Sequence, residues 1–395
     1  MNSYSDITIQ PLASSTQEKH YLLSCGDRYY EASYPIVELI IELQQKATKE
    51  EAISAYVETK KGKYTTGQVA DIMDKFITPI LVAKESKSHT FLYEKELLSA
   101  SNIDKYSNKF HFLFNKVYLW LVFAIMISMD MYFFFHAESL LAFNNAVNAY
   151  TVMGLFLFML FSSFVHELGH ASACKYFGIK HGGIGFGLYL NFPVLYTDVT
   201  EVWKLKRKQR LVVNIAGVYF QSICLIALLI GFLLTRNDIL RYLILIINLG
   251  FLMTLNPFFK FDGYWIMSDL LGVPNLHNRS KELLSYIYKR MCRQQMKQKP
   301  YLLQIRTIEK YSLLFYSTIV NIFMGIYFLY IIPRFLYHFI ISFPNEIQEL
   351  TLYLSNRLPP SFVLLRNVSM QLIFLTFIGF FFLKLVQSLR KHAKH

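Results

Sequence analysis

The sequence predicts a mainly α-helical, polytopic membrane protein with a small α+β soluble domain at its amino terminus. Of its 395 residues, 54% are hydrophobic and 16% aromatic, which is too apolar for an ordinary soluble protein. Long apolar runs occur only after residue 112, and Lys and Arg cluster between these runs, as they do in cytoplasmic loops. These loops account for the formal charge of +13, so we expect no nucleic-acid partner.

The amino-terminal stretch, residues 1–98, contains no apolar run long enough to span a bilayer and should fold in water. Segments of strand-favouring residues predict short strands at 7–12, 21–25 and 28–33. Gly26-Asp27 supplies the turn between the last two strands, which predicts a hairpin.

Three helices are expected after the hairpin. Apolar residues at helical spacing predict the first at 36–45. Thr48 with Glu51, and Thr65 with Gln68, have the spacing of capping boxes and mark the starts of the second and third helices. The third helix should run to about residue 81.

A hairpin followed by three helices, with YLLSCGDRYYEAS as its most characteristic stretch, resembles the small winged-helix domain of the PqqD-like, peptide-recognising type over about Ser14 to Lys84. The resemblance implies that a leader peptide adds as a strand to the hairpin edge. A domain that only regulates or anchors is the alternative. A DNA-binding winged helix is a third, for which residues 70–75 offer little basic surface. On this interpretation residues 99–111 are a linker and residues 112–395 form the membrane domain.

Apolar runs predict about six spanning segments, at residues 117–135, 151–165 with the helix that continues it, 211–234, 239–255, 311–332 and 370–389. The basic segments between them predict a multi-pass protein with both termini in the cytoplasm. The stretch 333–360 should then lie outside, with 335–343 as an interfacial helix. Asp130 and Asn321 fall inside spanning segments, where we expect them to bond neighbouring helices.

The stretch FSSFVHELGHASACK, residues 161–175, carries the strongest chemical signal. On a helix, His166 and His170 lie one turn apart on one face, so both imidazoles can reach one metal ion. Glu167 beside them can take a proton from a water molecule, and this HExxH arrangement suits zinc hydrolysis. Ionisable groups are costly beside lipid, which favours a protein interior or cavity around them.

A second stretch, NPFFKFDG at residues 256–263, follows the fourth predicted span and should reach the same depth as the histidines. Pro257 interrupts the helix there, and Asp262 is a carboxylate able to serve as the third zinc ligand. Two His and one Asp leave a fourth position for water, the open geometry of a catalytic zinc.

The pair HELGH and NPFFKFDG resembles the signature of the site-two protease family of intramembrane zinc peptidases, over about residues 112–310. The longer string LNPFFKFDGYWIMSDLLGVPNL is similar to its branch of peptide zinc metalloproteases. The resemblance implies a bacterial cytoplasmic-membrane enzyme in which His166, His170 and Asp262 bind Zn²⁺ and Glu167 is the catalytic base. Where many members have Ala-Gly-Pro and then Asn, this chain has Val218 and Gln221, so a substrate contact assigned to that Asn does not carry over.

A glycine-rich, aromatic stretch, residues 181–199, lies between the two motifs and is too short to span. Its strands could pair with an extended substrate, which makes Gly185, Phe186 and Asn256 the candidate substrate contacts. A plain interfacial hairpin is the alternative. His181 could stabilise an oxyanion, but a solvated loop histidine is the favoured interpretation.

Together these features predict a zinc endopeptidase that cuts near the cytoplasmic face and processes a ribosomally made precursor peptide during maturation or export. Its expected partners are that peptide or a membrane-anchored one, the lipid bilayer, and an exporter or modifying enzyme. Regulated intramembrane proteolysis of a membrane-anchored regulator is one alternative. A non-catalytic, zinc-holding export or immunity factor is another, but such a factor has no use for Glu167.

Overall fold

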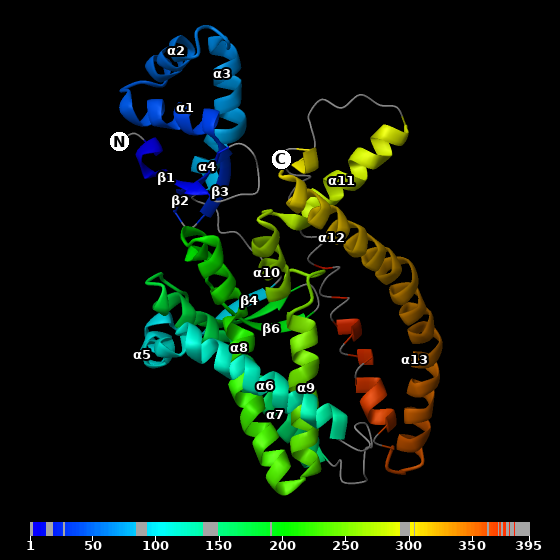
Figure 1. Ribbon diagram of the computed structural model, residues 1–395. Helices are drawn as coiled ribbons and strands as arrows, with labels where there is room; N and C mark the ends of the chain where they lie inside the picture. Colours follow the sequence, from blue (N-terminus) through cyan, green and yellow to red (C-terminus); the bar gives the residue numbers. More distant parts are fainter. Residues whose placement is uncertain are drawn as a thin grey trace. The chain divides into compact units, whose positions relative to one another are not determined.

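The protein is described by a computed structural model that covers residues 3–12, 19–26, 28–83, 93–136, 149–189, 192–292, 301–303, 305–361, 363–369 and a few positions between 371 and 383. The chain forms two compact units, one of residues 1–187 with 193–315 and one of residues 188–192 with 316–395. Figure 1 shows the elements in chain order. Helices predominate, and two small sheets accompany them.

The amino-terminal module begins with a three-stranded antiparallel sheet in the order β1-β2-β3 (Figure 1). The strands are β1 (Thr8–Leu12), β2 (His20–Cys25) and β3 (Arg28–Ser33). In its register Leu23 lies opposite Ile9 on one side and Tyr30 on the other. The three expected strands are therefore confirmed, although Asp27 of the expected turn lies outside the described residues.

Helices cover this sheet and bury its apolar residues. They are α1 (Tyr34–Gln45), α2 (Lys49–Thr59), α3 (Thr66–Ile72), a π-helical turn (Met73–Ile77) and α4 (Thr78–Ala83). The side chains of Thr48 and Thr65 accept backbone hydrogen bonds three residues on, which confirms both predicted helix starts. Leu23, Ile40 and Ile77 are buried in the common core.

A second sheet has the order β4-β5-β6, and two of its strands come from the membrane part of the sequence. Its strands are β4 (Tyr93–Leu98), β5 (Ile184–Tyr189) and β6 (Phe192–Thr197). The strands expected between the two motifs are thus present and adjacent, but β4 joins them from the end of the stretch assigned to the soluble module. The stretch assigned as a linker forms α5 (Ala100–Phe110), which packs on the helix that carries the histidines.

Within the described residues, three helices are long and apolar enough to cross a membrane, at Lys116–His136, Met153–Tyr176 and Arg207–Thr235. They belong to α6 (Lys116–His136), α7 (Ala149–Tyr176) and α8 (Arg207–Thr235). The part of the chain that the structure describes therefore contains three such helices, which does not fit the expected number of about six spans. The fourth expected span is α9 (Asp238–Thr254), whose 17 residues extend about 25 Å, less than the hydrocarbon core of about 30 Å.

The fifth expected span and the expected interfacial helix also differ from the structure. The fifth corresponds to α12 (Thr307–Ile326), which has Glu309 in its first turn and gives way to a π-helical turn at Tyr327–Ile331. The expected interfacial helix at 335–343 is part of a longer helix, α13 (Ile332–Ser355), which continues through Pro344. The sixth expected span lies largely outside the described residues.

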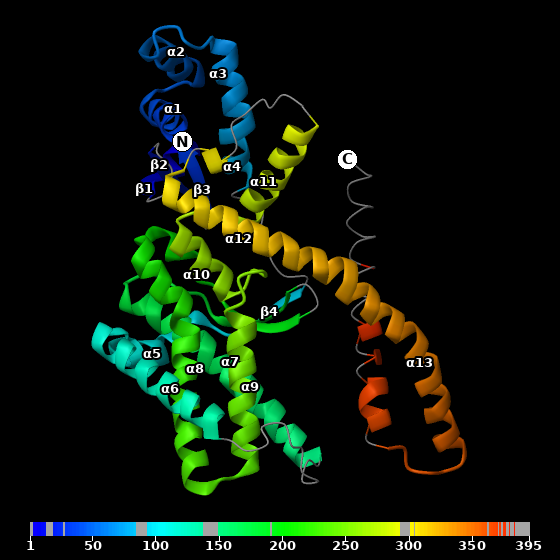
Figure 2. The same ribbon diagram turned by 45° about the vertical axis from the view of Figure 1, so that its right-hand side comes forward.

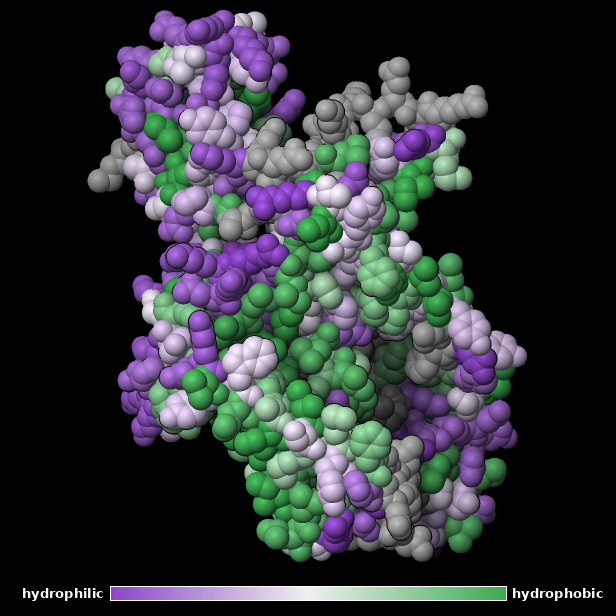
Figure 3. All heavy atoms as spheres, viewed as in Figure 1, coloured by the Kyte–Doolittle hydropathy of each residue, from purple (hydrophilic) through white to green (hydrophobic). Residues whose placement is uncertain are grey.

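Helices α6 to α9 lie side by side in Figures 1 and 2, with α8 in contact with each of the other three. On α6, Trp120 and Phe135 are 72% and 78% exposed, and Figure 3 shows hydrophobic residues gathered over this region. Asn248 of α9 donates a 2.9 Å hydrogen bond to Asp130 of α6, the interhelical role expected for Asp130. The exposed apolar surface fits helices that contact lipid, so the fold is that of a mainly helical membrane protein.

Candidate metal centre

Close packing of α7 against α8 sets the position of the two histidines. A Cβ atom on Gly169, between His166 and His170, would overlap the backbone of Ala216 on α8. Leu168, Ala171 and Ala216 are buried in the same core. Glycine at position 169 therefore allows the two helix backbones to approach where the histidines face α8.

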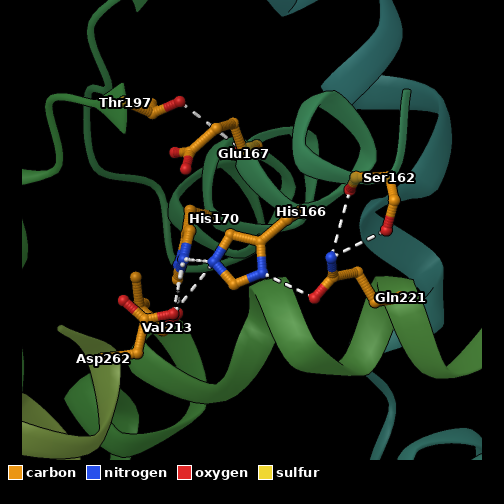
Figure 4. Close-up of polar contacts among 8 residues, drawn as sticks. All are labelled: Ser162, His166, Glu167, His170, Thr197, Val213, Gln221 and Asp262. Atoms are coloured by element: carbon orange, nitrogen blue, oxygen red, sulfur yellow. Dashed lines mark hydrogen bonds and ion pairs between the residues drawn. The ribbon is translucent and has the colours of Figure 1, made fainter. Parts of the chain in front are cut away.

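Three potential ligand atoms converge in this region. The Nε2 atoms of His166 and His170 lie 3.1 Å apart, and the Oδ2 atom of Asp262 lies 3.0 Å and 3.1 Å from them (Figure 4). Bonds of about 2.0–2.1 Å in a tetrahedral arrangement would place zinc ligand atoms about 3.3 Å apart. The triangle is close to that size, so the donor set fits a zinc ion.

The protonation of the histidines supports the same conclusion. Nδ1 of His170 donates a 2.8 Å hydrogen bond to the carbonyl oxygen of Val213, and Nδ1 of His166 lies 3.1 Å from Oε1 of Gln221 (Figure 4). In the tautomer that binds a metal, with its proton on Nδ1, each ring would turn its Nε2 lone pair toward the other ring and toward the Asp262 carboxylate. A cation between them removes this repulsion.

Asp262 reaches the histidines from the turn that follows α9. It is the first residue of α10 (Asp262–Leu271), and a Cβ on Gly263 would overlap the backbone of Leu255, so the chain turns tightly there. Burial acts to raise the pKa of Asp262, but positive charge at the triangle, carried by protonated His170 and His166 or by a bound metal ion in place of their protons, holds this pKa below its usual range. The residue is thus ionised, as a metal ligand must be.

A buried polar cluster attaches α10 to α8. Arg210 donates hydrogen bonds of 2.7 Å and 2.6 Å from Nε and Nη2 to Oδ1 of Asp269, and Asn214 donates one of 2.9 Å to Oδ2. Arg210 and Asp269 are 6% exposed, and the guanidinium lies over the ring of Trp203. This cluster fixes the helix that begins with Asp262.

Glu167 follows His166 on α7 and is 8% exposed. Figure 4 shows its carboxylate on the side of the site that faces β6. The hydroxyl of Thr197, the last residue of β6, donates a 3.5 Å hydrogen bond to the carbonyl oxygen of Glu167. The candidate base therefore stands between the ligand triangle and the end of a strand.

The three predicted substrate contacts differ in burial and in local contacts. Asn256 is half-buried, and its side chain accepts a 2.8 Å hydrogen bond from the backbone nitrogen of Phe258. Gly185 of β5 is buried, and a Cβ there would stand 2.6 Å from the Tyr196 ring of β6. Phe186 is half-buried on β5. Their substrate roles stay predictions.

His181 is not the solvated loop residue that we expected. Its side chain is 2% exposed, and Nε2 lies 3.0 Å from Oδ1 of Asp104 on α5. Lys175 of α7 pairs with the same carboxylate at 3.0 Å. The histidine therefore helps to fasten α5 to the end of α7, and among the described residues it is not part of the cluster of potential metal ligands.

Two residues of the site had no role in the sequence analysis. Gln221, noted there only as a departure from a family pattern, contacts His166, and Ser162 contacts Gln221 through hydrogen bonds of 2.8 Å and 3.3 Å. The sequence signals that could have found these two residues are spacing and polarity. Ser162 precedes His166 by four residues, and Gln221 is a long polar residue within an apolar helix.

Comparison with known proteins gives one partial relationship. A curated protein of Bacillus subtilis (strain 168), named "Putative peptide zinc metalloprotease protein YydH", is 26% identical over 119 residues, which are 30% of this chain and 47% of that protein. The alignment thus covers about half of the relative's length. No family model and no solved structure matches this chain. The similarity supports a zinc-metalloprotease-like relationship.

Proposed function

We propose that this protein is a membrane zinc endopeptidase in which His166, His170 and Asp262 hold the metal and Glu167 is the general base. The observation that carries the proposal is the 3.0–3.1 Å triangle of ligand atoms with Glu167 beside it on the same helix. The name of the partial relative supports the same reaction class.

The chemistry follows from these groups. A zinc ion bound there would polarise the scissile carbonyl and make the attacking water more acidic. Glu167 takes the proton from that water and passes it to the leaving amine. The contacts of Val213 and Gln221 hold the two imidazoles so that both Nε2 atoms face the ion.

The substrate that we propose is a ribosomally made precursor peptide, cut near the cytoplasmic face of the bacterial membrane in a multi-pass protein with both termini inside. The amino-terminal module has β3 at an edge of its sheet, where an extended leader could add as a strand. Holding the leader there would raise the effective concentration of the peptide at the metal centre. An exporter or modifying enzyme would then act on the same peptide.

The test uses the purified full chain, precursor peptides encoded beside its gene, and the variants Glu167→Gln and Asp262→Ala. Mass spectrometry would measure zinc content and cleavage. We expect about one zinc in wild type and in Glu167→Gln, but a cleavage rate about 10²–10⁴-fold lower in Glu167→Gln. Asp262→Ala should lose both zinc and cleavage. Glu201→Gln, which changes a carboxylate paired with Lys204 outside the triangle, is the matched control.

The outcomes separate the alternatives. Zinc binding with a precursor that is bound but not cut would favour the non-catalytic export or immunity factor. Cleavage of a membrane-anchored regulator in place of the precursor would keep the peptidase and replace its substrate. Equal cleavage by wild type and Glu167→Gln would overturn the assigned base.

A further inference from the structure

Helices α7 and α8 contact each other through three positions on α7 that are spaced by four residues and two positions on α8. On α7 these are Ser162, His166 and His170, and on α8 they are Val213 and Gln221, eight residues apart. His170 pairs with Val213, and Gln221 bridges His166 and Ser162 (Figure 4). The helices are therefore antiparallel here, and both imidazoles donate their outer hydrogen bonds to acceptors on α8.

The orientation of the Gln221 amide follows from its partners. The amide nitrogen lies 3.3 Å from the carbonyl oxygen of Ser162, which can only accept a hydrogen bond, and 2.8 Å from the Ser162 hydroxyl. The amide oxygen must then face Nδ1 of His166, 3.1 Å away. Because this oxygen can only accept, it selects the tautomer of His166 that carries its proton on Nδ1.

We infer that Gln221, oriented by Ser162, is a positioning residue that fixes His166 with its Nε2 lone pair turned toward the metal. The inference rests on the proposed metal centre and adds the hydrogen bond that orients one of its ligands. It also gives a role to the position at which this chain departs from the family pattern.

Burial makes this contact hard to replace. Ser162 and Gln221 are 4% and 9% exposed, so bulk water has little access to the Nδ1 atom of His166. Without the Gln221 oxygen, the Nδ1 proton loses its buried acceptor or moves to Nε2, where it blocks metal binding. Outer partners of metal-bound histidines typically contribute about 10–100-fold to metal affinity.

The experiment measures metal binding alone, in the full-length Glu167→Gln protein, by competition with a zinc chelator and by the visible spectrum of the Co²⁺-loaded protein. The test variants are Gln221→Leu, Gln221→Glu and Ser162→Ala. Two variants serve as matched controls. Ser222→Ala removes a buried hydroxyl that donates to the carbonyl oxygen of Val218 in its own helix, and Asn248→Leu removes an amide that pairs with Asp130.

We expect Gln221→Leu to weaken zinc binding by about 10–100-fold and to change the Co²⁺ spectrum. Gln221→Glu retains an acceptor for Nδ1 and should bind zinc within a few-fold of the parent. Ser162→Ala should lie between them, and both controls should bind as the parent does. Thermal unfolding of each apo-protein separates loss of fold from loss of the site.

Two results would overturn the inference while leaving the peptidase proposal intact. One is parental zinc affinity and spectrum in Gln221→Leu. The other is an equal loss in Gln221→Leu and Gln221→Glu that follows their thermal stability, which indicates packing alone. Absence of zinc binding in the parent itself would overturn the metal centre, and the inference with it.

Discussion

Gly217 of α8 lies against the imidazole ring of His166. A Cβ atom at position 217 would stand 2.5 Å from Nδ1 of that ring, closer than such atoms approach each other. The position is one turn before Gln221, so the same face of α8 supports the ring and accepts its hydrogen bond. The α7 and α8 backbones must therefore keep their present spacing for His166 to remain in the triangle.

Gly217→Ala should displace His166 and weaken zinc binding by at least about 10-fold, since metal sites tolerate little ligand displacement. Chelator competition would measure the change. Gly250→Ala is the control, because a Cβ on Gly250 of α9 meets no atom within 4 Å and should leave zinc affinity unaltered. Parental zinc affinity in Gly217→Ala would contradict the close packing.

Removal of zinc should lower the thermal stability of the protein, because the ligands come from α7 and α10 and an ion joins them. At a free zinc concentration of about 100 times Kd, the expected contribution is about 2.7 kcal/mol. Thermal unfolding in detergent, with and without a chelator, would measure it. In Asp262→Ala the two curves should coincide, and a persistent zinc-dependent shift there would place the ion elsewhere.

Asp269→Leu should destabilise the protein by about 3–5 kcal/mol, because it leaves the charge of Arg210 buried without its partner. Thermal and denaturant unfolding would report the loss, and zinc affinity should fall with it because α10 carries Asp262. The double variant Arg210→Met/Asp269→Leu should recover much of the stability. Asp74→Leu, which breaks an exposed pair with Lys49, should cost less than about 1 kcal/mol.

His277 on α11 (Leu276–Met291) should make the stability depend on pH. Burial lowers its pKa below the usual 6.5, and its Nε2 donates a 3.0 Å hydrogen bond to the carbonyl oxygen of Phe258. The unfolded chain therefore takes up this proton at a higher pH than the folded chain does, so stability is lost as pH falls below about 6.5.

The measurement for His277 compares zinc-free wild type with His277→Gln between about pH 5.5 and 7.5, the range around the usual histidine pKa. Wild type should lose more thermal stability toward the acid end. All other ionisable groups are common to both proteins, so their contribution cancels in the difference. Parallel curves would assign the acid sensitivity to other groups.

Local sequence signals predicted those features that residues close together in the sequence determine. The helix starts at Thr48 and Thr65 follow from a hydroxyl and a backbone N–H three residues apart. The proximity of His170 and Asp262 was predicted from helix spacing and from two chain segments that were expected to end at the same depth in the membrane. The roles of these residues in binding and catalysis stay predictions.

Features that depend on distant partners could not be read in this way. The residues of β4 are all exposed and give no alternating pattern, so its pairing with β5 has no local signal. The burial of His181 depends on Asp104 of α5, and the contact of Gln221 depends on the register between α7 and α8. The fourth expected span was not confirmed, because apolar composition does not set helix length and α9 has only 17 residues.

The separation of the ligands along the chain sets an order of events during synthesis. His170 and Asp262 are 92 residues apart, with α8 and α9 between them. A nascent chain that has emerged only as far as α9 carries both histidines and the glutamate but has no carboxylate to complete the triangle. The triangle of ligand atoms can therefore be completed only after residue 262 has been synthesised, and a polypeptide released before that point would lack the third potential ligand.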